Sequence, residues 1–80
     1  MRVIQSWDTA SKSHELADYS VGLTALLDRN DIYIVDVMRE RLDYPDLKRA
    51  VIDYAQRWNA DSVLIEDKGS GMSLLQDFRY

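Results

Sequence analysis

The sequence predicts an α/β fold built around a mixed sheet, and three observations carry this prediction. Residues 19–27 and 31–38 are rich in β-branched and aromatic side chains and are separated by the short charged segment DRN, which is typical of an antiparallel hairpin. Residues 47–58 carry an apolar stripe at helical spacing. The apolar run 62–67 follows that helix, and a strand joined to another through a helix usually lies parallel to it.

The remaining elements are predicted from local signals. Residues 2–8 alternate between two faces and predict a first strand, whereas the polar residues 9–18 predict a loop. Pro45 marks the start of the helix and Asn59 is placed to end it. A second helix is expected from a serine N-cap and an apolar face, Ser70 with Leu74, Leu75 and Phe78. The predicted order is strand, strand, strand, helix, strand, helix, with Trp7, Tyr54 and Trp58 in the core.

Length and composition limit the classes of function. Eighty residues make one small domain, and 46% hydrophobic with 30% charged residues is the composition of a folded chain. No apolar run approaches the roughly 20 residues of a bilayer span, so we expect no membrane contact and a cytoplasmic location. The chain has no cysteine and one histidine, which excludes disulfides and thiolate zinc sites. The net charge of −4 means that any contact with nucleic acid must be local.

Two acidic residues occupy comparable positions in the predicted sheet. Asp8 closes the first strand, and Glu66 closes the strand after the long helix. If these strands pair in parallel, both carboxylates emerge at the same edge of the sheet, where open α/β sheets bind ligands. Two neighbouring carboxylates favour a hard divalent ion such as Mg²⁺ or Mn²⁺. Each acid alone is more simply a loop cap or a water-facing side chain, and spacing alone leaves both interpretations of the pair open.

Four segments, in order along the chain, resemble the nuclease domain of the phage terminase large subunit: SWDTASKS, ADYSV, DVMRERLDYPDLKRAV and VLIEDKGSGMSLLQDFR. This resemblance implies an RNase H-like fold of the resolvase and integrase type. It implies a metal-dependent endonuclease that cuts concatemeric viral double-stranded DNA into packageable lengths. In that family three acids hold two divalent metals, Mg²⁺ or Mn²⁺. Asp8 matches the first acid and Glu66 the second, so both are the expected catalytic and metal-binding residues.

The family's third acid and fifth strand lie beyond Tyr80, so residues 1–80 correspond to a partial RNase H-like domain. Asp18 matches an acid in the DYS stretch and Asp67 follows Glu66, which makes both secondary candidates. Lys12 and Lys68 flank the two principal acids and are candidates for phosphate contacts. The resemblance also implies, in the bacterial host cell, an N-terminal ATPase motor domain, a small terminase subunit and the portal as partners. No Gly-rich phosphate loop of the GxxxxGK[ST] type occurs in these residues.

An alternative of a different class is a noncatalytic α/β module or prophage remnant. A sheet without its fifth strand would leave one edge of the strand 62–67 unpaired, and exposed edges pair readily with a second copy of the chain. This alternative predicts a homo-dimer and no stabilisation by metal ions.

Overall fold

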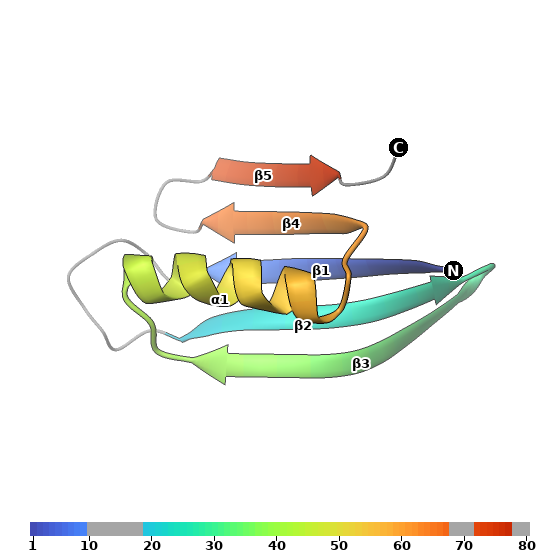
Figure 1. Ribbon diagram of the computed structural model, residues 1–80, viewed down its shortest axis with the longest axis horizontal. Coiled ribbons are helices and arrows are strands. Elements are labelled where there is room, and N and C mark those ends of the chain that lie inside the picture. Colours follow the sequence, from blue (N-terminus) through green and yellow to red (C-terminus); the bar gives the residue numbers. More distant parts are fainter. Residues whose placement is uncertain (10–18, 68–71, 78–80) are drawn as a thin grey trace.

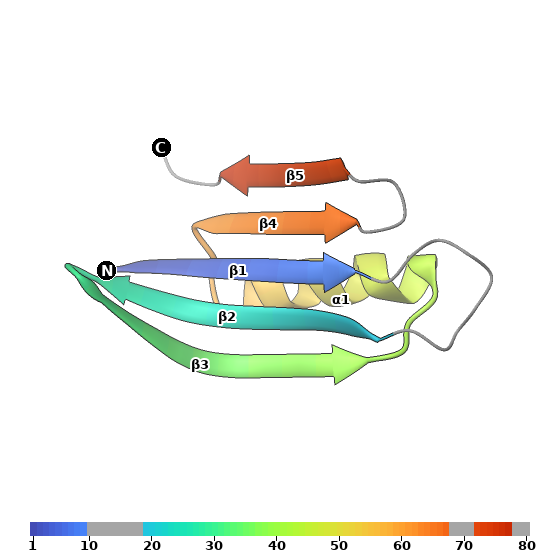
Figure 2. The ribbon, with the colours of Figure 1, turned by 180° about the vertical axis from the view of Figure 1, so that it is seen from behind.

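The computed structural model describes residues 1–9, 19–67 and 72–77, which form a five-stranded sheet with a helix packed on one face (Figure 1). The elements are β1 (Arg2–Thr9), β2 (Ser20–Asp28), β3 (Asp31–Glu40), α1 (Tyr44–Arg57), β4 (Ser62–Asp67) and β5 (Met72–Asp77). The strand order is β3-β2-β1-β4-β5. Seen from behind, the sheet lies in front of α1 and no described element covers its other face (Figure 2).

The predicted parallel pairing of the first strand with the strand after the helix is confirmed. β4 lies beside β1 and parallel to it, whereas β2 is antiparallel to both β1 and β3. Three hydrogen bonds near the first residues of β1 and β4 fix the register of these two strands. Val3 N donates to Asp61 Oδ2 at 2.7 Å, and Asp61 N donates to Val3 O at 2.7 Å. Arg2 Nη2 also donates to Ser62 Oγ at 2.9 Å. These bonds determine which residues of the two strands face each other further along.

The second helix expected after Ser70 is wrong, because residues 72–77 form strand β5. β5 runs antiparallel to β4, with Leu74 opposite Ile65 and Leu75 opposite Leu64. The physical reason is the exposed edge of β4: an apolar strand offers backbone N–H and C=O groups that the next segment of chain can satisfy. This long-range pairing outweighs a weak helical pattern. The edge of β4 that the self-association alternative required is therefore occupied.

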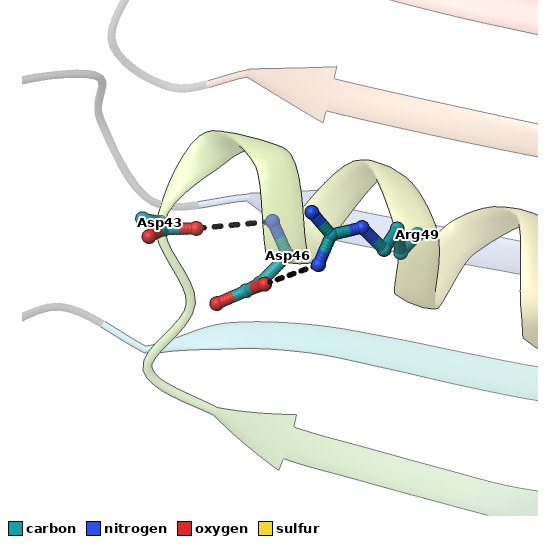
Figure 3. Close-up of polar contacts among 3 residues, drawn as sticks. All are labelled: Asp43, Asp46 and Arg49. Carbon is teal, nitrogen blue, oxygen red and sulfur yellow. Dashed lines mark hydrogen bonds and ion pairs between the residues drawn. The ribbon is translucent and has the colours of Figure 1, made fainter.

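Helix α1 has defined ends that its sequence explains. The Asp43 carboxylate caps the N-terminus by accepting from Asp46 N at 3.0 Å, and Arg49 pairs with Asp46 at 3.0 Å one turn further on (Figure 3). Asn59, with a φ of 51°, takes the left-handed conformation that ends the helix, as predicted. Within the described part of the chain, no helix is long and apolar enough to span a bilayer.

The core lies between α1 and the sheet. Trp7, Met38, Ala60 and Val63 are its buried residues, and the partly buried side chains packed against them include Leu47, Ala50, Val51, Tyr54 and Ala55 of α1. The ring centroids of Trp7 and Tyr54 are 5.8 Å apart, so both aromatic residues are core as predicted. Trp58 is only half-buried and lies outside this cluster, because it is the C-cap residue of α1.

A β-bulge in β3 changes which residues share a face of the sheet. Thr24 pairs with Asp36 and the next residue, Ala25, pairs with Ile34, so Val35 is an extra residue. Met38, beyond the bulge, is buried against α1, whereas Ile34 and Val37 are 56% and 57% exposed. Ile34 and Val37 therefore both lie on the face away from α1, three positions apart instead of two or four.

Candidate metal centre

Asp8 and Glu66 are direct partners in the parallel pair of β1 and β4. Neighbouring strands are about 4.8 Å apart, and directly opposed residues point to the same face of a sheet. Trp7 and Ile65, the preceding residues on the two strands, pack with α1, so the two acids lie on the face away from α1. β1, β3 and β4 all have their carboxyl ends on the same side of the molecule, at the left in Figure 1. Asp8 and Glu66 lie at the carboxyl ends of β1 and β4.

The backbone around this pair is held on both strands. Thr9 is only 4% exposed, and its Oγ1 donates to the carbonyl oxygen of Glu66 at 3.0 Å. On the other side of Asp8, the indole of Trp7 is 2% exposed and fixed in the core. Because the residues on either side of Asp8 are buried and one of them is bonded to Glu66, the two carboxylates project from a well-determined piece of sheet.

The donor set suits a hard divalent cation. Asp8 is half-buried and Glu66 is exposed, so the pair combines a carboxylate close to the sheet surface with one that solvent reaches. Carboxylate oxygens are the preferred ligands of Mg²⁺ and Mn²⁺, and Mg²⁺ commonly takes one or two protein carboxylates together with waters. Across the described ranges, no three His, Cys, Asp or Glu side chains come together. The residues therefore fit a site with two protein ligands.

The structure places one of the remaining candidate residues and does not describe the other three. The strand register pairs Asp67 with Thr9, one position beyond the Asp8–Glu66 pair. Asp18, Lys12 and Lys68 lie outside the described residues, so their roles stay predictions.

The comparison with known protein families agrees with this geometry. The chain matches the terminase RNaseH-like domain family over residues 5–80. It belongs to this family. The mixed sheet with its α1 layer is thus a partial RNase H-like fold, and a phage terminase nuclease is the general class that the family indicates. No curated protein and no solved structure matches the chain significantly.

One feature of this terminase domain was not found from the sequence. Arg39 pairs with Val21, and Val21 pairs with Asp8, so Arg39 lies in the same cross-strand row as the two acids and on the same face. The guanidinium of Arg39 lies 3.8 Å from the ring centroid of Tyr19, and that of Arg41 lies 4.7 Å from it. Regular alternation along β3 from Ile34 assigns Arg39 to the wrong face, and only the bulge corrects this assignment.

Proposed function

We propose that this terminase RNaseH-like domain is a metal-dependent endonuclease unit that cleaves the phosphodiester backbone of concatemeric viral double-stranded DNA during packaging. The observation that carries the proposal is the direct pairing of Asp8 with Glu66 at the carboxyl ends of two parallel strands. In the whole protein we further propose an N-terminal ATPase motor domain, a small terminase subunit and the portal as partners.

In this function Asp8 and Glu66 hold Mg²⁺ or Mn²⁺ through their carboxylate oxygens. A bound divalent cation supplies positive charge for the phosphate and makes a water molecule more acidic. The protein contributes the fixed spacing of the two carboxylates, which the parallel register and the Thr9 bond to Glu66 maintain. Without a cation, the same two carboxylates repel a phosphate, so the acid pair itself holds a phosphate only when the metal is bound.

The test is a metal titration with thermal stability as the readout. A metal that binds the folded chain raises its melting temperature, so millimolar Mn²⁺ or Mg²⁺ should stabilise the native protein. Asp8→Asn and Glu66→Gln should each remove this increase. Asp31→Asn is the matched control, because it removes one exposed carboxylate at the β2–β3 turn, at the opposite end of β2 from the residue that pairs with Asp8. Equal stabilisation of all four proteins would contradict the proposal.

Self-association is a second candidate function, and it would use the edge strand β3 instead of β4. β3 is an edge strand, and its Ile32, Tyr33, Ile34 and Val37 are 66%, 52%, 56% and 57% exposed. Apolar edge strands pair readily with other chains, although a bulge such as the one at Val35 opposes such pairing. Sedimentation equilibrium would detect a dimer, and Ile34→Lys should dissociate it; a native chain that is monomeric at the highest soluble concentration rejects this candidate.

A further inference from the structure

We propose that Arg39 and Arg41, stacked against Tyr19, form a binding site for DNA backbone phosphates beside the Asp8–Glu66 pair. The inference rests on the proposed function, because it assigns the adjoining part of the same DNA-binding surface. It adds a contact to phosphates other than the one that is cleaved.

The position of Arg39 relative to the acids follows from the strand register. Arg39, Val21 and Asp8 are successive partners across β3, β2 and β1. With strands about 4.8 Å apart, the Cα atoms of Arg39 and Asp8 are separated by about 10 Å. Consecutive phosphates along one DNA strand are closer together than this separation. A duplex with one phosphate at the acid pair therefore brings a neighbouring phosphate of the same strand within reach of the Arg39 side chain.

The arginines are held in place by an aromatic ring. Their guanidinium carbons lie 3.8 Å and 4.7 Å from the centroid of Tyr19, which is itself 39% exposed. Stacking of a guanidinium on a ring restricts the side chain while leaving the N–H donors at its edge available. Tyr19 is therefore a positioning residue, and the two guanidinium groups are the contacts to the ligand.

The charges of the two arginines are not neutralised within the described part of the chain. Both side chains are exposed, and no described carboxylate forms an ion pair with either of them. By contrast, Arg49 and Arg57 on α1 pair with Asp46 and Asp53 at 3.0 Å and 3.2 Å. Two adjacent guanidinium groups that pair with no carboxylate of the described residues suit an anion, and Arg binds phosphate through paired N–H donors.

The chemistry of the surroundings selects a nucleic-acid backbone as the ligand. The net charge of −4 opposes bulk attraction of a polyanion, so binding depends on a local cluster of positive charge on the correct face. Arg39 provides that charge in the row that also contains the proposed metal ligands. A small phosphorylated molecule would not need two basic groups placed at this distance from a metal site, whereas a polymer of phosphates does.

The experiment measures binding of a duplex of about 20 base pairs by fluorescence anisotropy in EDTA, between about 20 and 200 mM salt. Each phosphate contact contributes about 0.9 to the slope of log K against log salt. Arg39→Ala combined with Arg41→Ala should lower the slope by about 1.8 and the affinity at low salt by roughly tenfold or more. The control is Arg49→Ala combined with Arg57→Ala. It makes the same change in net charge and also removes an arginine stacked on a tyrosine, since Arg57 lies 4.8 Å from the Tyr54 centroid.

The role of Tyr19 has its own pair of variants. Tyr19→Leu removes the ring and should weaken DNA binding several-fold, because the arginines lose their support. Tyr19→Phe keeps the ring and should restore near-native affinity. Circular dichroism confirms that each variant is folded, and a Tyr19→Leu chain that binds DNA like the native chain contradicts the positioning role.

Two results overturn the phosphate site: no measurable duplex binding by the native chain at about 20 mM salt, or the same salt slope for the Arg39/Arg41 variant as for its control. The metal titration of the native chain separates this failure from failure of the proposed function. If metal stabilisation depends on Asp8 and Glu66 but the salt slope does not depend on the arginines, only the phosphate site is wrong. If the slope changes but no metal stabilisation occurs, the metal-dependent function is wrong.

Discussion

The ring of Trp7 lies directly over Gly22, its cross-strand partner on β2. A Cβ atom on residue 22 would come within 2.6 Å of Cη2 and Cζ3 of that ring. The indole is 2% exposed and packed against Tyr54, so it has no room to retreat. Because Gly22 has no side chain, the indole of Trp7, the largest side chain in the core, can lie directly against the backbone of β2.

Gly22→Ala should destabilise the protein by about 1–3 kcal/mol, since an added methyl group overpacks this contact. Chemical denaturation measures the change. In a double-mutant cycle, the cost of Gly22→Ala should fall once Trp7→Leu has removed the ring. An undiminished cost in that background would show that the methyl group acts through the backbone instead of through the indole.

The apolar face of α1 should dominate its contribution to stability. Tyr54→Ala should cost about 2–4 kcal/mol, because it removes the ring that packs on Trp7. Val51→Ala should cost less, about 1 kcal/mol, because it removes only two carbon atoms from a side chain that, like Tyr54, is partly buried. Lys48→Ala, at an exposed position of the same helix, is the control and should stay within about 0.5 kcal/mol. A larger loss of unfolding free energy at Lys48 than at Tyr54 would reverse the assignment of the buried face.

The N-cap of α1 gives a further prediction. Asp43→Ala removes the acceptor for Asp46 N, and we expect a loss of about 1 kcal/mol in the free energy of unfolding. Asp43→Ser retains a capping oxygen and should recover most of that loss. If Ser and Ala at position 43 were equally destabilising, the negative charge near the helix N-terminus would be the important property instead of the hydrogen bond.

Nuclease activity of the 80-residue chain should be weak, and stronger with Mn²⁺ than with Mg²⁺. Two protein carboxylates leave most coordination positions to water, and Mg²⁺ demands a more regular arrangement of ligands. Plasmid nicking measures the activity, which should vanish in both Asp8→Asn and Glu66→Gln. Cleavage that survives both substitutions would place the nuclease site on other residues.

The sequence predicted the part of this fold that depends on strong local patterns. The helical stripe of α1, its Asn59 terminus and the hairpin of β2 with β3 were all visible as periodicity and turn chemistry. These local patterns need no knowledge of what other segments of the chain do. The adjacency of Asp8 and Glu66 was predicted from the crossover helix together with the family resemblance, because the crossover rule alone gives the direction of β4 and not its neighbour.

The errors have a common physical cause. Residues 72–77 contain two adjacent leucines, a pattern that fits a short helix or a buried strand equally well. The decision came from the unsatisfied edge of β4, which is a property of the assembled sheet. The arginines near the acids were missed for a similar reason, since a bulge is a mismatch between two strands and leaves no signal in either one alone.

The bulge at Val35 lets β3 carry one more residue than its partner strand without changing the faces on which the later residues lie. Five positions separate Ile34 from Arg39, an odd number, yet both residues lie on the same side because Val35 occupies a place of its own. Deleting Val35 would restore regular alternation and leave Arg39 opposite Val21 and Met38 opposite Gly22, on the faces that they occupy now. The bulge thus absorbs a length difference of one residue, and the basic group stays in the row of Asp8 with or without it. Chains of this family that differ in length at β3 should be aligned by strand partner at this point, because counting residues from the β2–β3 turn would pair positions from opposite sides of the sheet.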